Sequence, residues 1–74
     1  MMGRLDEAVA SWEKALSLNP NYDLALYNVG LAYLEKGDKK QALQSFLRYL
    51  QVKGRTISEA EQKEIADLIE KCRR

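Results

Sequence analysis

The residues of this chain that could do chemistry are few, and none has the partners that catalysis requires. The 74 residues include no histidine, which removes the commonest general base of enzymes. The single cysteine, Cys72, has only Lys71 and Arg73 beside it to lower its pKa, and it falls on an apolar helix face. This setting predicts a small buried core thiol rather than a nucleophile. We therefore expect no catalytic residue and no enzymatic activity.

Acidic side chains near the C-terminal end are candidate metal ligands by type but not by arrangement. They are Glu59, Glu61, Glu64, Asp67 and Glu70. A transition-metal site on a helix would need a histidine one turn away, so a solvated acidic face is the better interpretation. The four glycines, at positions 3, 30, 37 and 54, are too scattered for a phosphate-binding loop. The sequence predicts neither a metal nor a cofactor.

A basic cluster is the best case for nucleic-acid binding, with Tyr49 as a candidate stacking ring. It consists of Lys36, Lys39, Lys40, Arg48, Lys53 and Arg55. However, Glu35 and Asp38 are interleaved, and 12 Lys and Arg against 11 Asp and Glu give a net charge of +1. A nearly neutral chain exerts no long-range pull on nucleic acid or anionic lipid. We expect neither as a partner, and we expect Tyr49 to have a packing role.

Length and hydropathy favour one small soluble domain. A chain of 74 residues and 8.5 kDa buries only a marginal core. The longest apolar runs are a few residues, and the chain begins with MMGRLDEA, which lacks the apolar core of a signal peptide. One cysteine excludes an internal disulfide and favours a reducing compartment. We expect a cytoplasmic protein with no membrane partner.

Apolar residues at helical spacing predict an all-α chain of four helices. The first helix should run from about Arg4 to Leu18, because Asn19-Pro20 stops it. The second should run from about Asp23 to Lys36, with Asn21 as its N-cap.

Turn and capping residues set the limits of the other two helices. Gly37 supplies a left-handed C-terminal residue, and Asp38 followed by Gln41 predicts an N-cap for a third helix over about 39–53. Ser58 and Glu61 form a capping box that opens a fourth helix, which should continue through about residue 72.

Small and large residues recur at fixed spacing on the second and third helices. They are Leu26, Val29, Gly30 and Tyr33, followed by Ala42 and Phe46. Gly30 and Ala42 lack bulk, so the helix backbones can approach closely, while Tyr33 and Phe46 fill the space beside them. The spacing also repeats: one period of 34 residues pairs Ala8 with Ala42, Trp12 with Phe46, and Pro20 with Gly54.

This pattern resembles the tetratricopeptide repeat, with Leu26 where the family most often has Trp and Val29-Gly30 in place of Leu-Gly. The resemblance implies antiparallel helix-turn-helix repeats, as in a fragment of an α-solenoid. The second copy departs from the pattern at Tyr49, where the family prefers a small residue, and at Gly54, where it has proline. These departures indicate an altered packing environment near the end of an array.

The resemblance divides a single domain, 1–74, into three parts. These are the second helix of a half repeat over 4–20, a complete repeat over 23–54 and a C-terminal capping helix over 57–73. The last helix keeps one narrow apolar stripe, made of Ile57, Ile65, Leu68, Ile69 and Cys72. One apolar and one charged face suit a terminal helix, which has no successor to bury it. Because the first unit lacks its first helix, the resemblance also implies a fragment of a longer array.

By resemblance, the function is protein–protein interaction, with a concave groove that takes up a partner's extended or helical segment. The implied groove residues are Leu24, Tyr27, Asn28, Leu31, Leu34 and Glu35. Asn28 matches an asparagine with which some members clamp a peptide's C-terminal carboxylate, but the clamp's basic residues are not matched. An apolar, tyrosine-containing groove is therefore favoured over a clamp. The alternative is that these residues only pack on the fourth helix.

Self-association is a second functional hypothesis. The first helix has an apolar face without a covering helix, formed by Leu5, Val9, Trp12 and Leu16. A second copy of the chain, paired about a two-fold axis, would bury both Trp12 rings and form a homodimer. If further repeats precede this segment, the same face would be an internal joint instead.

Overall fold

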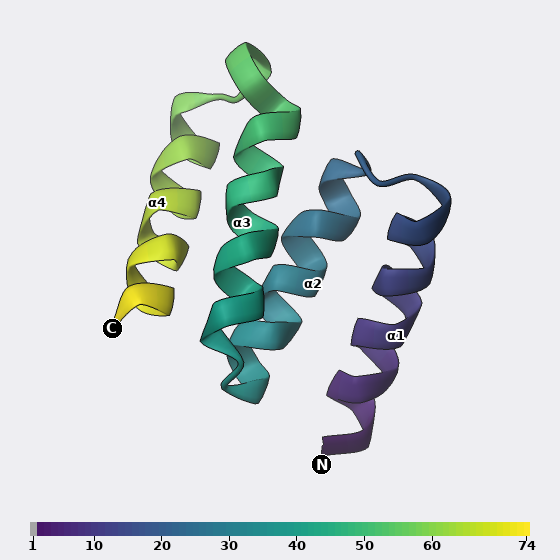
Figure 1. The fold of residues 1–74 in the computed structure, drawn as a ribbon. Coiled ribbons are helices and arrows are strands. Elements are labelled where there is room, and N and C mark those ends of the chain that lie inside the picture. Colours follow the sequence, from purple (N-terminus) through teal and green to yellow (C-terminus); the bar gives the residue numbers. More distant parts are fainter. Residues whose placement is uncertain (1) are drawn as a thin grey trace.

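A computed structural model of the chain describes residues 2–74, so residue 1 of the predicted 1–74 domain lies outside the described range. Four α-helices and one short 3₁₀-helix make up this range (Figure 1). The helices are α1 (Met2–Leu18), α2 (Asp23–Lys36), α3 (Lys39–Lys53), η1 (Gly54–Thr56) and α4 (Glu59–Arg73). Residues 2–74 contain no strand, and the predicted all-α helical-repeat class is confirmed.

Local signals determine most of the helix ends. Gly37 has a left-handed backbone (φ 88°), and its N–H donates to the Leu34 carbonyl. The Asp38 side chain accepts a hydrogen bond from the Gln41 N–H at 3.3 Å. At the start of α4 the capping box is complete, with Ser58 as the N-cap. These ends agree with the sequence prediction.

The start of α2 is different, because Tyr22 rather than Asn21 is the N-cap. The Tyr22 N–H donates to the Asn19 carbonyl in a tight turn, and the Asn21 N–H donates to the Asn19 side chain. Asn21 therefore lies one residue too early to cap the helix. Asp23 accepts a hydrogen bond from the Leu24 N–H at 2.9 Å instead.

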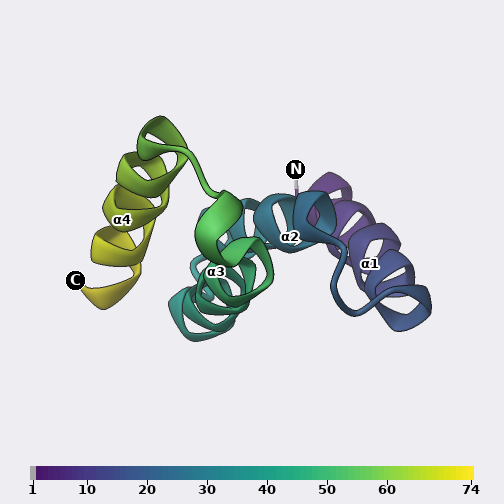
Figure 2. The same ribbon diagram turned by 90° about the horizontal axis from the view of Figure 1, so that it is seen from above.

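Extensive contacts join helices that are consecutive in the chain: α1 with α2, α2 with α3, and α3 with α4. In Figure 2, α3 lies between α4 and α2 and is displaced towards the lower side of the view. Such nearest-neighbour packing is typical of helical-repeat proteins. None of the described helices combines the length and the apolar character needed to cross a membrane.

The main buried cluster belongs to α2, α3 and α4. Its members are Leu26, Ala42, Phe46, Tyr49, Ile65, Leu68 and Cys72. Phe46 is completely buried, and a Cβ atom added to Gly30 would lie 2.5 Å from Cε1 of its ring. The close approach predicted from Gly30 is thus present. Burial also raises the pKa of the Cys72 thiol, as expected for a core cysteine.

Candidate functional site

Three helices line an open groove of about 310 Å³, which we call the α2–α4 groove. It is lined by Asp23, Leu24 and Tyr27 from α2, Tyr49 and Lys53 from α3, and Glu61 and Glu64 from α4. These residues come from the first two turns of α2, the last turns of α3 and the first turns of α4. The groove therefore lies where α2 and α4 flank the C-terminal half of α3.

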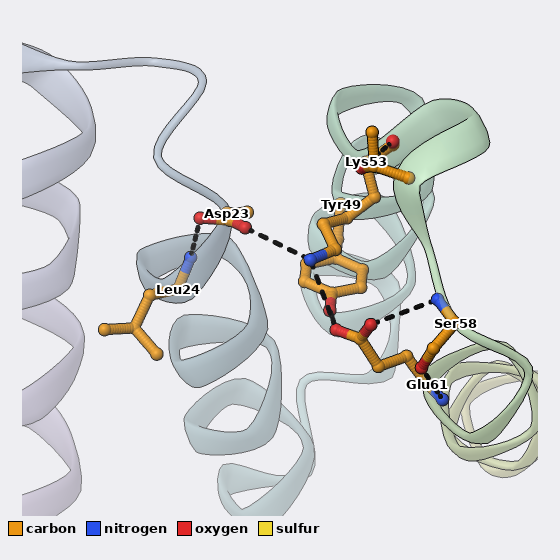
Figure 3. Close-up of polar contacts among 7 residues, drawn as sticks. Asp23, Leu24, Tyr49, Lys53, Ser58 and Glu61 are labelled. Carbon is orange, nitrogen blue, oxygen red and sulfur yellow. Dashed lines mark hydrogen bonds and ion pairs between the residues drawn. The ribbon is translucent and has the colours of Figure 1, made fainter.

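An ion-pair network crosses the groove from α2 to α4 (Figure 3). The Lys53 Nζ lies 3.2 Å from Glu61 Oε2 and 3.6 Å from Asp23 Oδ2. The hydrogen bond with Glu61 is the main cause of a raised Lys53 pKa. The pKa of Glu61 is lowered to about 2, chiefly because its carboxylate accepts the Ser58 backbone N–H, with further contributions from Ser58 and Tyr49 hydroxyls and Lys53. Glu61 thus completes the capping box of α4 and also takes part in the ion-pair network.

Two tyrosines form the aromatic wall of the groove, and their rings lie 5.7 Å apart between centroids. The Tyr27 hydroxyl donates to the Glu64 carboxylate, and the Tyr49 hydroxyl donates to Glu61 Oε2 at 3.0 Å. The pKa of Tyr27 is raised to about 12, chiefly by its hydrogen bond to Glu64. Burial is the first cause for Tyr49, whose pKa is also raised to about 12. Both hydroxyls therefore remain neutral donors over the physiological range.

The groove lining combines an exposed apolar residue with acidic side chains. Leu24 is 51% exposed. Three carboxylates face one ammonium, which gives the lining a formal charge of −2. Glu64 forms no ion pair with any lysine or arginine of residues 2–74. The groove can thus accept hydrogen bonds and positive charge beside an apolar contact.

Two family models match the chain: one described as a TPR repeat over residues 2–37 and one described as a tetratricopeptide repeat over residues 24–55. The chain belongs to the tetratricopeptide repeat (TPR) family. The predicted resemblance is confirmed. TPR repeats are generally protein-interaction modules and typically non-catalytic scaffolds, so membership implies a protein partner. A search of curated proteins found no match to this TPR chain.

Two of the six residues that the TPR resemblance assigned to a groove, Leu24 and Tyr27, line the cavity. Asn28 is not among the lining residues, and its amide donates to the Leu24 carbonyl at 2.8 Å. Leu31 and Leu34 are partly buried against the core cluster. Glu35 is exposed outside the cavity. The cavity of this TPR chain thus covers only the N-terminal part of the predicted α2 surface.

Most of the groove lining was not assigned from the sequence. The additional residues are Asp23, Tyr49, Lys53, Glu61 and Glu64. Tyr49 has the packing role expected for it, since it is only 6% exposed, but its ring is also part of the wall. The sequence did contain one signal for this role: Tyr49 is a large aromatic residue at a position where the TPR pattern has a small one.

Part of the basic cluster is engaged within the chain. Lys36 pairs with Asp6 at 2.5 Å, Lys53 pairs with two carboxylates, and the Lys39 Nζ donates to the Arg74 carbonyl at 3.4 Å. Of these three cations Lys53 lies near the Tyr49 ring, with its Nζ 6.0 Å from the ring centroid, and it is already paired with carboxylates of the groove.

The predicted self-association face lies along α1. All four residues, Leu5, Val9, Trp12 and Leu16, are partly buried. α1 lies at the edge of the array and packs on α2 (Figure 1). Two polar contacts add to this packing, the Lys36–Asp6 ion pair and a 2.9 Å hydrogen bond from the Tyr33 hydroxyl to Glu13. α2 therefore covers this apolar face only in part.

Proposed function

We propose that this TPR chain is a non-catalytic interaction module that binds a segment of a partner protein in the α2–α4 groove. The α2–α4 groove itself carries the proposal, because its volume of about 310 Å³ is large enough to take up side chains of another chain. The rings of Tyr27 and Tyr49 supply an aromatic wall, Leu24 lies at the edge of the groove, and charged groups of Lys53, Glu61 and Glu64 lie beside the rings. A cavity with an apolar wall and a few convergent polar groups is the usual form of a binding site.

The amphipathic form of α4 supports a capping role for 57–73, after a half repeat over 4–20 and a complete repeat over 23–54. Ile65, Leu68 and Cys72 are buried against the array, while the opposite face is charged and exposed. In this role α4 closes the core and also supplies one wall of the groove.

The proposal is tested by selecting peptide ligands on the intact chain and mapping them by the amide chemical shifts of isotope-labelled protein. Displayed random peptides are the probe. We expect binders whose shifts centre on Leu24, Tyr27 and Tyr49. Leu24→Asp should then reduce binding strongly, because it places a charge on the apolar rim.

Leu47→Asp on α3 is the matched control for that variant. Leu47 is 46% exposed, almost as much as Leu24, and it lies outside the α2–α4 groove. Its replacement should leave the same peptides bound. Binders that map elsewhere, or an equal loss in both variants, would show that the groove is not the binding site.

Homo-oligomerisation through the α1 face is the second candidate, favoured by the partial burial of Leu5, Val9, Trp12 and Leu16. Light scattering over micromolar concentrations tests it directly. A dimer that dissociates on Trp12→Glu would support self-association, because the carboxylate would be buried between copies. A mass equal to one chain at every concentration would exclude it.

A further inference from the structure

We infer that the partner segment bound in the α2–α4 groove presents a lysine or arginine next to an apolar side chain. This inference rests on the proposed function, since it names the chemistry of the ligand for the same groove.

The charge of the groove carries the first step. Its lining has a formal charge of −2, whereas the whole chain has +1, so the negative potential is local to this surface. A cavity with one sign of charge attracts ligands of the opposite sign. The net charge of the chain does not oppose a basic segment strongly enough to cancel this local attraction, because exposed charges beyond about 8–10 Å are screened at physiological ionic strength.

The ion pairs within the groove show which of its carboxylates can take a further cation. Lys53 already lies near both Asp23 and Glu61. Glu64 differs, because one of its oxygens accepts the Tyr27 hydroxyl and no cation of residues 2–74 pairs with it. An incoming ammonium or guanidinium would therefore reach an accessible carboxylate at Glu64 without displacing Lys53.

The aromatic and apolar parts of the wall fit the same ligand. The Lys53 Nζ lies 6.0 Å from the Tyr49 ring centroid, so one ring of the pair already has a cation near its face. Tyr27 stands next to Glu64 and offers a second ring. Long basic side chains bury their aliphatic stems along apolar surfaces, and the Tyr27 ring provides such a surface beside Glu64. The half-exposed Leu24 at the edge of the groove is open to a neighbouring apolar residue of the same segment.

An acidic ligand fits the groove poorly. A carboxylate or phosphate would meet three carboxylates and one lysine that is already paired. Asn28, the residue that matches a carboxylate clamp, uses its amide on the Leu24 carbonyl. The groove thus lacks the free donors that recognition of an anionic terminus requires.

The composition of the selected groove binders is the first test. Peptides whose shifts map to Leu24, Tyr27 and Tyr49 should be enriched in lysine or arginine beside leucine, methionine or phenylalanine. Groove binders that are neutral or acidic would overturn this inference and leave the proposed function standing. Absence of any groove binder would instead defeat the proposed function.

Two variants with opposite expected effects give the second test. Glu64→Gln should weaken a basic groove peptide about fivefold, the effect of one partly exposed ion pair. Glu70→Gln removes the same charge from α4 outside the groove and is the matched control. Lys53→Gln makes the lining one unit more negative, and the same peptide should bind about fivefold more tightly.

The sign of the Lys53→Gln effect is decisive. A loss of affinity would mean that Lys53 itself contacts an anionic ligand group, and it would overturn the inference. Equal affinities for wild type, Glu64→Gln and Glu70→Gln would do so as well. Circular dichroism of each variant, recorded under the binding conditions, establishes that it retains its helices.

Discussion

The two outer helices, α1 and α4, each pack mainly on one neighbour but bury their apolar residues to different extents. In α4 the buried residues are Ile65, Leu68 and Cys72, with exposed fractions of 1%, 8% and 8%. In residues 3–18 of α1 no side chain is buried, and six apolar residues are only partly covered: Leu5, Ala8, Val9, Trp12, Ala15 and Leu16. The apolar stripe of α4 is narrow enough for α3 to cover, whereas α1 has more apolar surface than α2 covers.

This difference shows how a repeat array can end. A helix with one narrow apolar stripe can close the array, because a single neighbour satisfies it. A helix with a wide apolar face keeps part of that surface available to another chain or repeat. The α4 end therefore suits a cap, and the α1 end suits a joint.

Truncation in α4 should have the largest effect on stability. Ile65 is almost fully buried, so Ile65→Ala should lower the free energy of unfolding by about 3 kcal/mol through lost burial and a residual cavity. Denaturant unfolding followed by circular dichroism measures this loss. A value below that of Trp12→Ala would contradict the difference between the outer helices.

Truncation in α1 should cost less, although the side chain removed is larger. The ring of Trp12 is only partly covered, so Trp12→Ala should cost about 1–2 kcal/mol, below the roughly 3–5 kcal/mol of a fully buried tryptophan. The same unfolding experiment, run at a concentration where the chain is monomeric, tests this. A loss at the upper end of the larger range would mean that the α1 face is covered in solution.

Glycine-to-alanine substitutions compare the packing at α1 with that between α2 and α3. In Gly30→Ala the new Cβ would meet the Phe46 ring at 2.5 Å, and we expect a net loss of about 1 kcal/mol after the gain in helix propensity. At Gly3, in α1, a Cβ would meet nothing within 4 Å. Gly3→Ala should therefore stabilise the protein by about 0.5 kcal/mol. Equal effects at both positions would refute this comparison.

Local residues predicted most of the fold, because helix ends depend on neighbours in the chain. Gly37 and the Ser58–Glu61 capping box illustrate this, since each acts within one helical turn. The prediction of Asn21 as the N-cap of α2 was wrong, because the turn after α1 places Tyr22 at that position. The position of the N-cap depends on the hydrogen bond from the Tyr22 N–H to the Asn19 carbonyl, which the residue types alone do not specify.

The groove was predictable only where the repeat pattern continues. Leu24 and Tyr27 lie on the helix that the TPR pattern identifies, and they line the cavity. The other walls depend on contacts between distant residues, such as Tyr27 with Glu64, which are 37 positions apart. Because α4 departs from the repeat, no periodic signal connected Glu61 and Glu64 to α2.

The smallest expected effect is a dependence on pH at the start of α4, which has acidic residues in its first turn, whereas α1 has none there. The pKa of Glu61 is lowered from 4.5 to about 2 in the folded protein. A lowered pKa adds stability above pH 4.5, where the carboxylate is ionised in both states, and this contribution is lost as the pH falls toward 2. Wild-type stability should therefore decrease across that interval.

Glu61→Gln should flatten the same decrease, because glutamine can retain the capping hydrogen bond but cannot titrate. The free energy of unfolding, measured at a series of pH values, should differ most between wild type and variant above pH 4.5 and converge near pH 2. Glu59→Gln is the control, since Glu59 forms no ion pair in the described part of the chain and should preserve the wild-type slope. An unchanged slope in Glu61→Gln would show that the network of Lys53, Tyr49 and Ser58 does not hold the start of α4.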